Sequence, residues 1–373
     1  MGHDLLPPGP LRIRGELLPM VGPVRLYVCG VTPYDVTHLG HAATFVWVDA
    51  LVRTLRAAHL QPVVTRNVTD VDDVLTEAAR RAGSPYDEYA AIHQYSFDHD
   101  MSELGVRRPD HEPRAHQHIG GVVRLAQALL DRGAAYEFNG TVYFRGADVP
   151  GRAGLDASAA REQFAEFGED LDDPGKEHPF DVPVWRASHD GDPSWPSPWG
   201  PGRPGWHAEC TAMVLSHYGS SLDVHAGGAD LAFPHHAYEA AQAEAATGVA
   251  PFARAWMRVG TVRIGGEKMA KSTGNLVLVA DLLKDHRPGA LRLMILERHW
   301  SEGWDYSPEL LVAAEGRLDA LHTAAGRRGD DEVAEREVVR RLLDDVDVAG
   351  AIGIAQESGG RSARVLIQVL GLE

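Results

Sequence analysis

The chain has 373 residues, a formal net charge of −17 and only two cysteines. Its composition, 44% hydrophobic and 24% charged, is typical of a globular protein with a sizeable core and excludes collagen-like and disulfide-framework proteins. No apolar run approaches the roughly 20 residues of a membrane-spanning helix, and the N-terminal residues lack a signal-peptide core, so we expect a cytoplasmic protein without a membrane partner. The acidic charge disfavours nucleic acid as the main partner, because phosphate binding depends on Lys and Arg.

The first predicted elements are a strand, a loop, a helix and a second strand. Residues 24–29 form a β-rich run that ends before a loop containing Gly30. Apolar residues with helical spacing follow from Phe45 to Leu55, and residues 62–69 predict the next strand. This order is typical of an α/β unit with parallel strands and a right-handed crossover.

A long insertion is expected next, at about residues 110–204. Residues 119–133 predict a helix, and residues 136–144 predict a hairpin that turns at Asn139 and Gly140. The later part of the insertion is rich in Pro, Gly and Asp, so we expect loops that lie over or beside the sheet.

The remaining chain predicts further strands and then helices. Residues 222–225 indicate one strand, another is expected to end near residues 262–264, and the pattern is helical from about Pro288. We therefore expect an α/β fold, with a Rossmann-type parallel sheet in a catalytic domain of residues 1–285. Residues 286–373 are expected to form a C-terminal helical bundle.

Two motifs could bind phosphates. His38 and His41 flank a glycine directly before the first helix, where the polarised N-terminus favours anions. Lys268 and Lys271 lie on a glycine-marked loop that could close on the same pyrophosphate. Either motif alone also fits exposed histidines or a surface lysine turn. Together, in this order on an α/β chain, they indicate a class I aminoacyl-adenylate site.

Four residues suggest a metal site. Cys29 and Cys210, the only cysteines, occur beside His- and Trp-rich turns, and His235 precedes Glu239 by four residues, so those two would share one face of a helix. Thiolate, imidazole and carboxylate are zinc ligands, and zinc binds a substrate thiol in preference to a hydroxyl. The alternative is that both cysteines are small buried apolar residues.

Two other residues have open roles. Asp230 follows a glycine pair at a predicted strand end, where open α/β sheets bind ligands, but it could equally be a helix N-cap. Trp206 lies close to Cys210 and could form a pocket wall, whereas most of the tryptophans between residues 185 and 206 are expected to pack in the core.

These motifs resemble those of cysteinyl-tRNA synthetases and, more closely, the actinobacterial mycothiol cysteine ligases that join cysteine to the amino group of glucosaminyl-inositol. The shared segments are residues 27–30, 37–42, 67–73, 205–210, 227–236 and 268–275. Those that favour the ligases are residues 32–35, 37–42, 174–176, 185–186 and 193–198. The likeness runs from about residue 24 to the C-terminus.

The resemblance implies one Zn²⁺ per chain on Cys29, Cys210 and His235, with the substrate thiol completing the shell, and ATP with Mg²⁺ as a substrate. It implies that His38, His41, Lys268 and Lys271 handle the phosphates. The implied contacts to cysteinyl-adenylate are Gly30, Val31, Thr32, Thr44, Asn67, Val68, Thr69, Trp206, Gly228, Ala229, Asp230 and Val262.

The sequence departs from the ligase pattern at three places. Residues 236–239 read His-Ala-Tyr-Glu where the ligases have His-Glu-Phe and a small residue, and Glu239 instead matches a fourth zinc ligand of the tRNA synthetases. Residues 166–171 read Glu-Phe-Gly-Glu-Asp-Leu where the ligases have Glu-Arg-Gly-Gly-Asp-Pro, and Ala270 replaces a serine. The first two departures bear on the acceptor, and the role of Glu239 stays open.

The expected reaction joins L-cysteine to a small amine, with cysteinyl-adenylate as the intermediate. Glucosaminyl-inositol is the favoured acceptor. The alternatives are a paralogue that uses another amine, a cysteinyl-tRNA synthetase, and a non-catalytic cysteine- or adenylate-binding regulator.

We expect no anticodon-binding domain, and hence no tRNA partner, because about fifty residues of helix follow residue 320. A monomer or small homo-oligomer is expected, and Asp35, His225 and Asp230 are candidates for the base in amide formation.

Overall fold

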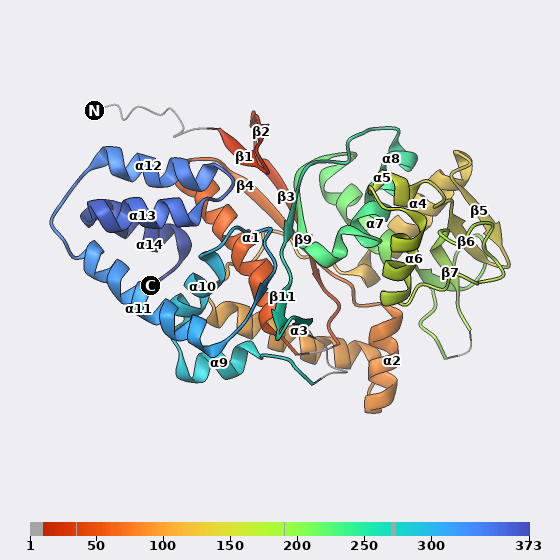
Figure 1. The fold of residues 1–373 in the computed structure, drawn as a ribbon. Coiled ribbons are helices and arrows are strands. Elements are labelled where there is room, and N and C mark those ends of the chain that lie inside the picture. The colour runs from red at the N-terminus through yellow and green to blue at the C-terminus, as the bar shows by residue number, and fades with distance from the viewer. Residues whose placement is uncertain (1–9, 35, 190, 270–273) are drawn as a thin grey trace.

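A parallel sheet lies at the centre of the protein. The computed structural model describes residues 10–34, 36–189, 191–269 and 274–373 (Figure 1). The sheet contains, in spatial order, β10 (Ala253–Val259), β9 (Leu222–Gly228), β3 (Val24–Val31) and β4 (Pro62–Val68). From β3 the chain proceeds outward to β4 on one side and later to β9 and β10 on the other. The strand order therefore reverses between β3 and β9, where open α/β sheets bind ligands.

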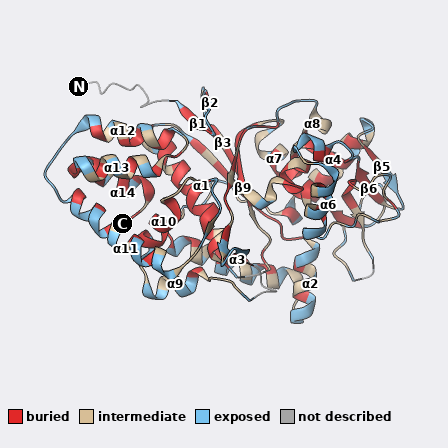
Figure 2. Cartoon of the chain, viewed as in Figure 1, coloured by how far each residue is buried: buried red, intermediate tan, exposed pale blue. Residues whose placement is uncertain are grey.

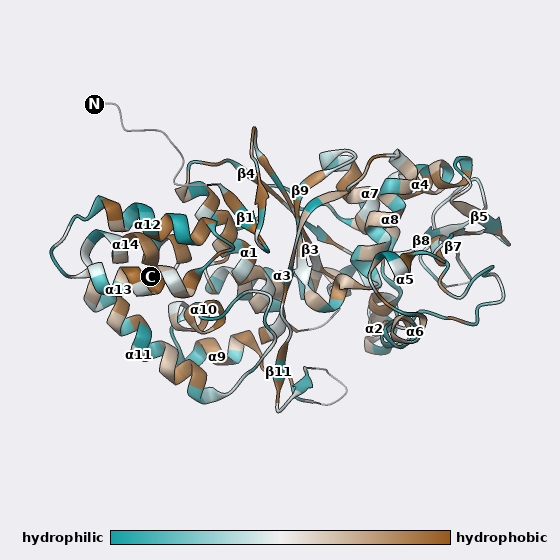
Figure 3. Cartoon of the chain, turned by 45° about the horizontal axis from the view of Figure 1, so that its top comes forward, coloured by the Kyte–Doolittle hydropathy of each residue, from teal (hydrophilic) through white to brown (hydrophobic). Residues whose placement is uncertain are grey.

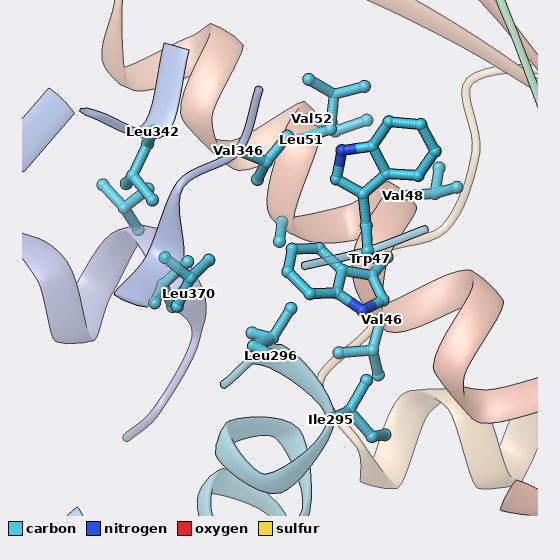
Figure 4. Close-up of a cluster of buried hydrophobic side chains, with 14 of the residues drawn as sticks. Val46, Trp47, Val48, Leu51, Val52, Ile295, Leu296, Leu342, Val346 and Leu370 are labelled. Carbon is cyan, nitrogen blue, oxygen red and sulfur yellow. The ribbon is translucent and has the colours of Figure 1, made fainter. Parts of the chain in front are cut away.

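Helix α1 (Leu39–Ala57) connects β3 to β4 and is buried on most of its sides. The imidazole Nδ1 of His38 caps its N-terminus by accepting a hydrogen bond from the backbone N–H of Gly40 at 3.1 Å. Trp47 on this helix packs in one apolar cluster with Leu296 and Leu370 of the C-terminal helices (Figure 4). The predicted strand–helix–strand unit is confirmed, and α1 joins the sheet to the C-terminal region.

The insertion contains its own sheet and core. Antiparallel strands β5 (Ala135–Phe138), β6 (Thr141–Phe144), β7 (Val182–Ala187) and β8 (Gly202–Pro204) pack with helices α4 (Ile119–Asp131), α5 (Val149–Arg152) and α6 (Ala157–Glu166). Asn139 and Gly140 both have positive φ, 52° and 84°, which confirms the predicted hairpin turn. In the later part of the insertion, where loops over or beside the sheet were expected, β7 and β8 extend the hairpin by long-range pairing.

The C-terminal region is helical, as predicted. It contains α9 (Val279–Asp285), α10 (Pro288–Leu296), α11 (Pro308–Ala325), α12 (Glu332–Leu343), α13 (Val348–Ser358) and α14 (Gly360–Leu370). These helices lie on one side of the central strands and the insertion lies on the other (Figure 1). The central strands and α1 are buried, whereas α11 has exposed segments (Figure 2). Apolar and polar residues alternate along the outer helices (Figure 3), as expected where one face packs and the other meets solvent.

A buried ion pair fixes α10 against α1. The guanidinium of Arg292 donates to the Asp49 carboxylate at 2.7 Å and to the carbonyl oxygens of Leu370 and Leu104. These bonds satisfy a charge that has no access to water. Helix α1 and the C-terminal helices share one hydrophobic cluster, so among the described residues no separate cores mark a domain boundary near residue 285. That boundary stays a prediction.

The remaining elements surround this framework. They are the hairpin β1 (Leu11–Ile13) and β2 (Glu16–Leu18), helices α2 (Asp73–Ala82), α3 (Tyr86–Glu103), α7 (Trp206–Tyr218) and α8 (His235–Thr247), the short helices η1 (Ala115–Gln117) and η2 (Ala229–Ala232), and a small sheet of β11 (Val262–Ile264), β12 (Glu267–Lys268) and β13 (Trp304–Asp305). A strand ends at Ile264, as expected, but this strand, β11, belongs to the small sheet, whereas β10 of the central sheet ends at Val259. Among the described residues, no helix has the length and apolar character needed to cross a bilayer.

Candidate active site

A cavity of about 720 Å³ opens at the carboxyl ends of β3, β4 and β9. Its lining includes the loop before α1, the N-terminal part of α7, and the β10–β11 turn. Residues from the insertion also reach it. The volume is in the range of small-molecule sites, and the place is where the strand order reverses.

Most of the predicted site residues meet in this cavity. Those that line it are Cys29, Gly30, Val31, Thr32, His38, His41, Thr44, Asn67, Thr69, Trp206, Cys210, Gly228, Asp230, His235, Val262 and Lys268. Val68 and Ala229 are not among the described lining residues. Lys271, Asp35 and Ala270 fall outside the described residues.

The sulfur end of the cavity consists of Cys29, Cys210, His235 and Glu239. One possible ligand atom from each of these four residues lies within 4.8 Å of the others, and all four side chains are buried. They come from β3, α7 and α8, so chain segments about 180 residues apart meet here. Two thiols, an imidazole and a carboxylate suit a tetrahedral zinc ion, so the donor chemistry fits the metal that the sequence predicts.

A second set of donors, which the sequence analysis did not predict, adjoins the first. His225 and His236 form a group with Cys29 and Glu239, again within 4.8 Å of one another. The Nε2 of His225 lies 3.3 Å from a Glu239 oxygen, and neither ring nitrogen of His236 has a hydrogen-bond partner among the described residues. His225 and His236 do not line the cavity, whereas three members of the sulfur end do. The sulfur end is therefore the set that can meet a substrate.

Burial and neighbouring charges shift the pKa values of the side chains at the sulfur end. Burial, followed by the neighbouring Cys210 and Glu239, raises the pKa of Cys29 well above its ordinary value. Burial also acts to raise the pKa of Glu239, but His225 and His235 outweigh it, so the net shift is downward. Burial lowers the pKa of His235 to about 3. The cluster thus offers a carboxylate and a neutral imidazole, and the two thiols would ionise only with a cation to balance them.

Backbone and side-chain contacts fix the chain around Cys29. The backbone N–H of Gly30 donates to the Asn67 Oδ1 at 2.8 Å, and the Asn67 amide donates to the Cys210 sulfur at 3.2 Å. A Cβ atom on Gly30 would lie 1.8 Å from the Asn67 carbonyl oxygen, so β3 and β4 approach closely only because this residue is glycine. The hydroxyls of Thr32 and Thr69 lie 2.7 Å apart at the same strand ends.

The phosphate end of the cavity consists of His38, His41, Asp230 and Lys268. The two imidazoles stack with their ring centres 3.8 Å apart, and burial, followed by the charge of His38, lowers the pKa of His41 to about 3. The Lys268 ammonium lies 3.0 Å from an Asp230 oxygen. Burial opposes the charge on Lys268, but Asp230 and Glu166 outweigh it and raise its pKa. The interpretation of Asp230 as a helix N-cap is wrong, because Gly228 occupies that position in η2.

An aromatic wall, Phe167 and Trp206, joins the two ends. The Trp206 ring stacks on His235 with centres 4.2 Å apart and on Phe167 with centres 5.8 Å apart. The Lys268 ammonium lies 5.6 Å from the centre of the Phe167 ring. Trp206 therefore forms a pocket wall, whereas Trp185 is fully buried in the core of the insertion, as expected.

Comparison with known proteins identifies the family. Residues 19–316 match the family described as tRNA synthetases class I (C) catalytic domain. A relative from Streptosporangium roseum is 40% identical over 95% of this chain and 89% of its own length, and one from Streptomyces griseus is 45% identical over 89% and 83%. Both are named L-cysteine:1D-myo-inositol 2-amino-2-deoxy-alpha-D-glucopyranoside ligase. The chain belongs to this family of ligases.

A solved structure shares the fold of this ligase family member. Methionyl-tRNA synthetase of Mycobacterium tuberculosis, in complex with methionyl-adenylate, superposes with a TM-score of 0.65 over 94% of this chain and 88% of its own, at 17% identity. The predicted class I synthetase fold is thus confirmed, and the protein is an enzyme. The roles of individual site residues stay predictions.

Proposed function

We propose that this enzyme activates L-cysteine with ATP and transfers the cysteinyl group to the amine of glucosaminyl-inositol. The observation that carries the proposal is the sulfur end, where Cys29, Cys210, His235 and Glu239 converge within 4.8 Å beside a cavity of ligand size. The names of the relatives supply the acceptor, a 2-amino-2-deoxy-glucopyranoside of inositol. A zinc ion bound there would take the substrate side chain as a thiolate and so select cysteine over serine.

The first step forms the adenylate. The carboxylate of cysteine attacks the α-phosphorus of ATP, which enters with Mg²⁺, and pyrophosphate leaves. The Lys268 ammonium would stabilise charge on the leaving group, and the polarised N-terminus of α1 with His38 would face the phosphates. Asp230 and Val262, which also line the cavity, would contact the nucleotide. No strong base is needed, because the substrate carboxylate is already ionised.

The second step forms the amide. The neutral amine attacks the cysteinyl carbonyl carbon, the C–N bond forms, the C–O bond to the phosphate breaks, AMP leaves and one proton is released. Orientation of the two reactants supplies much of the rate, since both are held in one cavity. We include Glu239 as a fourth zinc ligand, because its lowered pKa keeps it ionised beside both cysteines, and the substrate thiolate would then bind as a fifth ligand.

Two assays test this proposal. Zinc-loaded protein should catalyse ATP–pyrophosphate exchange that depends on cysteine, and it should yield a cysteinyl amide by mass spectrometry when glucosaminyl-inositol is added. Other amines and purified tRNA are tested in parallel. Preferential charging of tRNA, or of a different amine, would refute the acceptor. A lack of exchange in zinc-loaded protein would refute the activation step and favour a binding protein.

A further inference from the structure

The insertion contributes a carboxylate and an aromatic ring to the cavity. Glu166 is the last residue of α6 and Phe167 follows it, and both line the cavity. The Glu166 side chain is 57% exposed, and its only partner among the described residues is Lys268, with 3.2 Å between the Lys268 nitrogen and a Glu166 oxygen. This carboxylate is therefore accessible to a molecule bound in the cavity.

We propose that Glu166 and Phe167 form the acceptor subsite, in which the Glu166 carboxylate binds the ammonium group of a ring-borne primary amine and the Phe167 ring packs against the face of that ring. This inference rests on the proposed function and extends it to the residues that choose the acceptor. We assign Glu166 to binding of the protonated amine, which must lose its proton to water before the neutral form attacks the carbonyl carbon.

The position of the aromatic wall supports this assignment. Trp206 stacks on His235, so it adjoins the sulfur end, where the side chain of cysteine would lie. Phe167 contacts Trp206 on one side and Lys268 on the other. Its ring therefore connects the sulfur end of the cavity to the phosphate end. The reacting carbonyl joins those two parts of the adenylate, so an acceptor seated on Phe167 would be next to it.

The ion pair between Glu166 and Lys268 can be replaced by one with a substrate amine at a low cost in free energy. Lys268 is also paired with Asp230, and both carboxylates are substantially exposed, so the two contacts are weak and open to solvent. When Lys268 engages the phosphates, as proposed for the first step, Glu166 is left as an anion beside the aromatic ring. A cationic amine restores the charge balance that Lys268 provided, and the charge-assisted hydrogen bond gives it direction.

The main test is Glu166→Gln, with Glu162→Gln as the matched control. Glu162 lies one turn earlier on the exposed side of α6 and is not among the residues that line the cavity. Glu166→Gln should raise the KM for glucosaminyl-inositol about tenfold, the loss expected for one charge-assisted hydrogen bond, with a much smaller change in kcat. Glu162→Gln should leave both constants unchanged, and Glu166→Asp should recover most of the affinity.

A second measurement separates charge recognition from shape. N-acetylated glucosaminyl-inositol keeps the sugar rings but lacks the ammonium group, so as a competitive inhibitor it should bind the wild type and Glu166→Gln equally well. Phe167→Leu should weaken binding of the amine and of its N-acetyl derivative together, and Phe167→Tyr should restore both.

The outcomes are distinguishable from failure of the proposed function. An unchanged acceptor KM in Glu166→Gln, or a rise confined to the KM for ATP, would overturn the subsite while cysteine-dependent exchange and amide formation stand. The second result would mean that Glu166 only positions Lys268. Absence of exchange or of amide formation in the unmodified protein would overturn the proposed function and, with it, this subsite.

Discussion

The sulfur end and the phosphate end of the cavity are built in different ways. The four side chains of the sulfur end are buried, come from β3, α7 and α8, and converge within 4.8 Å. At the phosphate end, the Lys268 side chain is 43% exposed, lies on the two-residue strand β12, and pairs with exposed carboxylates. Rigid surroundings suit selection of a side chain, whereas exposed ion pairs suit a lysine that must change partners during a reaction. The predictions below test this contrast.

The largest effect is expected for Cys210→Ser, at the sulfur end. Serine keeps the size of the side chain but is a poor zinc ligand, so zinc content should fall and cysteine-dependent exchange should drop by more than roughly a hundredfold. Exchange kinetics and metal analysis measure this. The thermal midpoint should match that of chelator-treated wild type, which serves as the control. Full activity with a zinc-free variant would contradict the metal-based selection of cysteine.

A smaller loss is expected for Lys268→Gln, at the phosphate end. Removing a cation that stabilises charge on the leaving group should slow exchange about a hundredfold, without loss of zinc or of the cysteine-binding cluster. Lys284→Gln, at an exposed lysine of α9, is the control and should behave as wild type. If Lys268→Gln lost zinc as Cys210→Ser does, the two ends would not be independent.

The smallest effect concerns the acid stability of the zinc-free protein and involves His207, whose Nδ1 lies 3.0 Å from the Nδ1 of His235 at the sulfur end. Burial lowers the pKa of His207 from 6.5 to about 3, so below pH 6.5 the unfolded chain binds a proton that the folded chain excludes. The contribution of His207 to stability is therefore complete above pH 6.5 and is lost as the pH falls. His207→Gln should make the decline between pH 6.5 and 4.5 shallower by about 1.4 kcal/mol per pH unit.

Urea denaturation at each pH measures this slope, and His189→Gln, at an exposed histidine of the insertion, is the control. An identical slope in wild type and His207→Gln would show that His207 takes up its proton equally in the folded and unfolded chains. Such a result would also weaken the distinction between the buried sulfur end and the exposed phosphate end.

Local sequence patterns by themselves determined several elements of this protein and pointed to the chemistry of its candidate site. The β-rich run before Gly30, the apolar spacing of α1 and the Asn139–Gly140 turn are short-range signals, because backbone conformation and helix periodicity act over a few residues. The residue types of the sulfur end likewise indicated a thiol-binding metal before any geometry was available, since few side chains can bind zinc.

Tertiary structure alone decided which distant residues meet. His225 and His236 join the sulfur donors, and Glu166 reaches Lys268, only because separate segments fold against one another. The pairing of β7 with β6 is another long-range choice, and a Pro-rich stretch gave no periodic signal for it. Contacts between distant segments depend on how whole layers pack, which is a property of the complete chain and not of any local pattern.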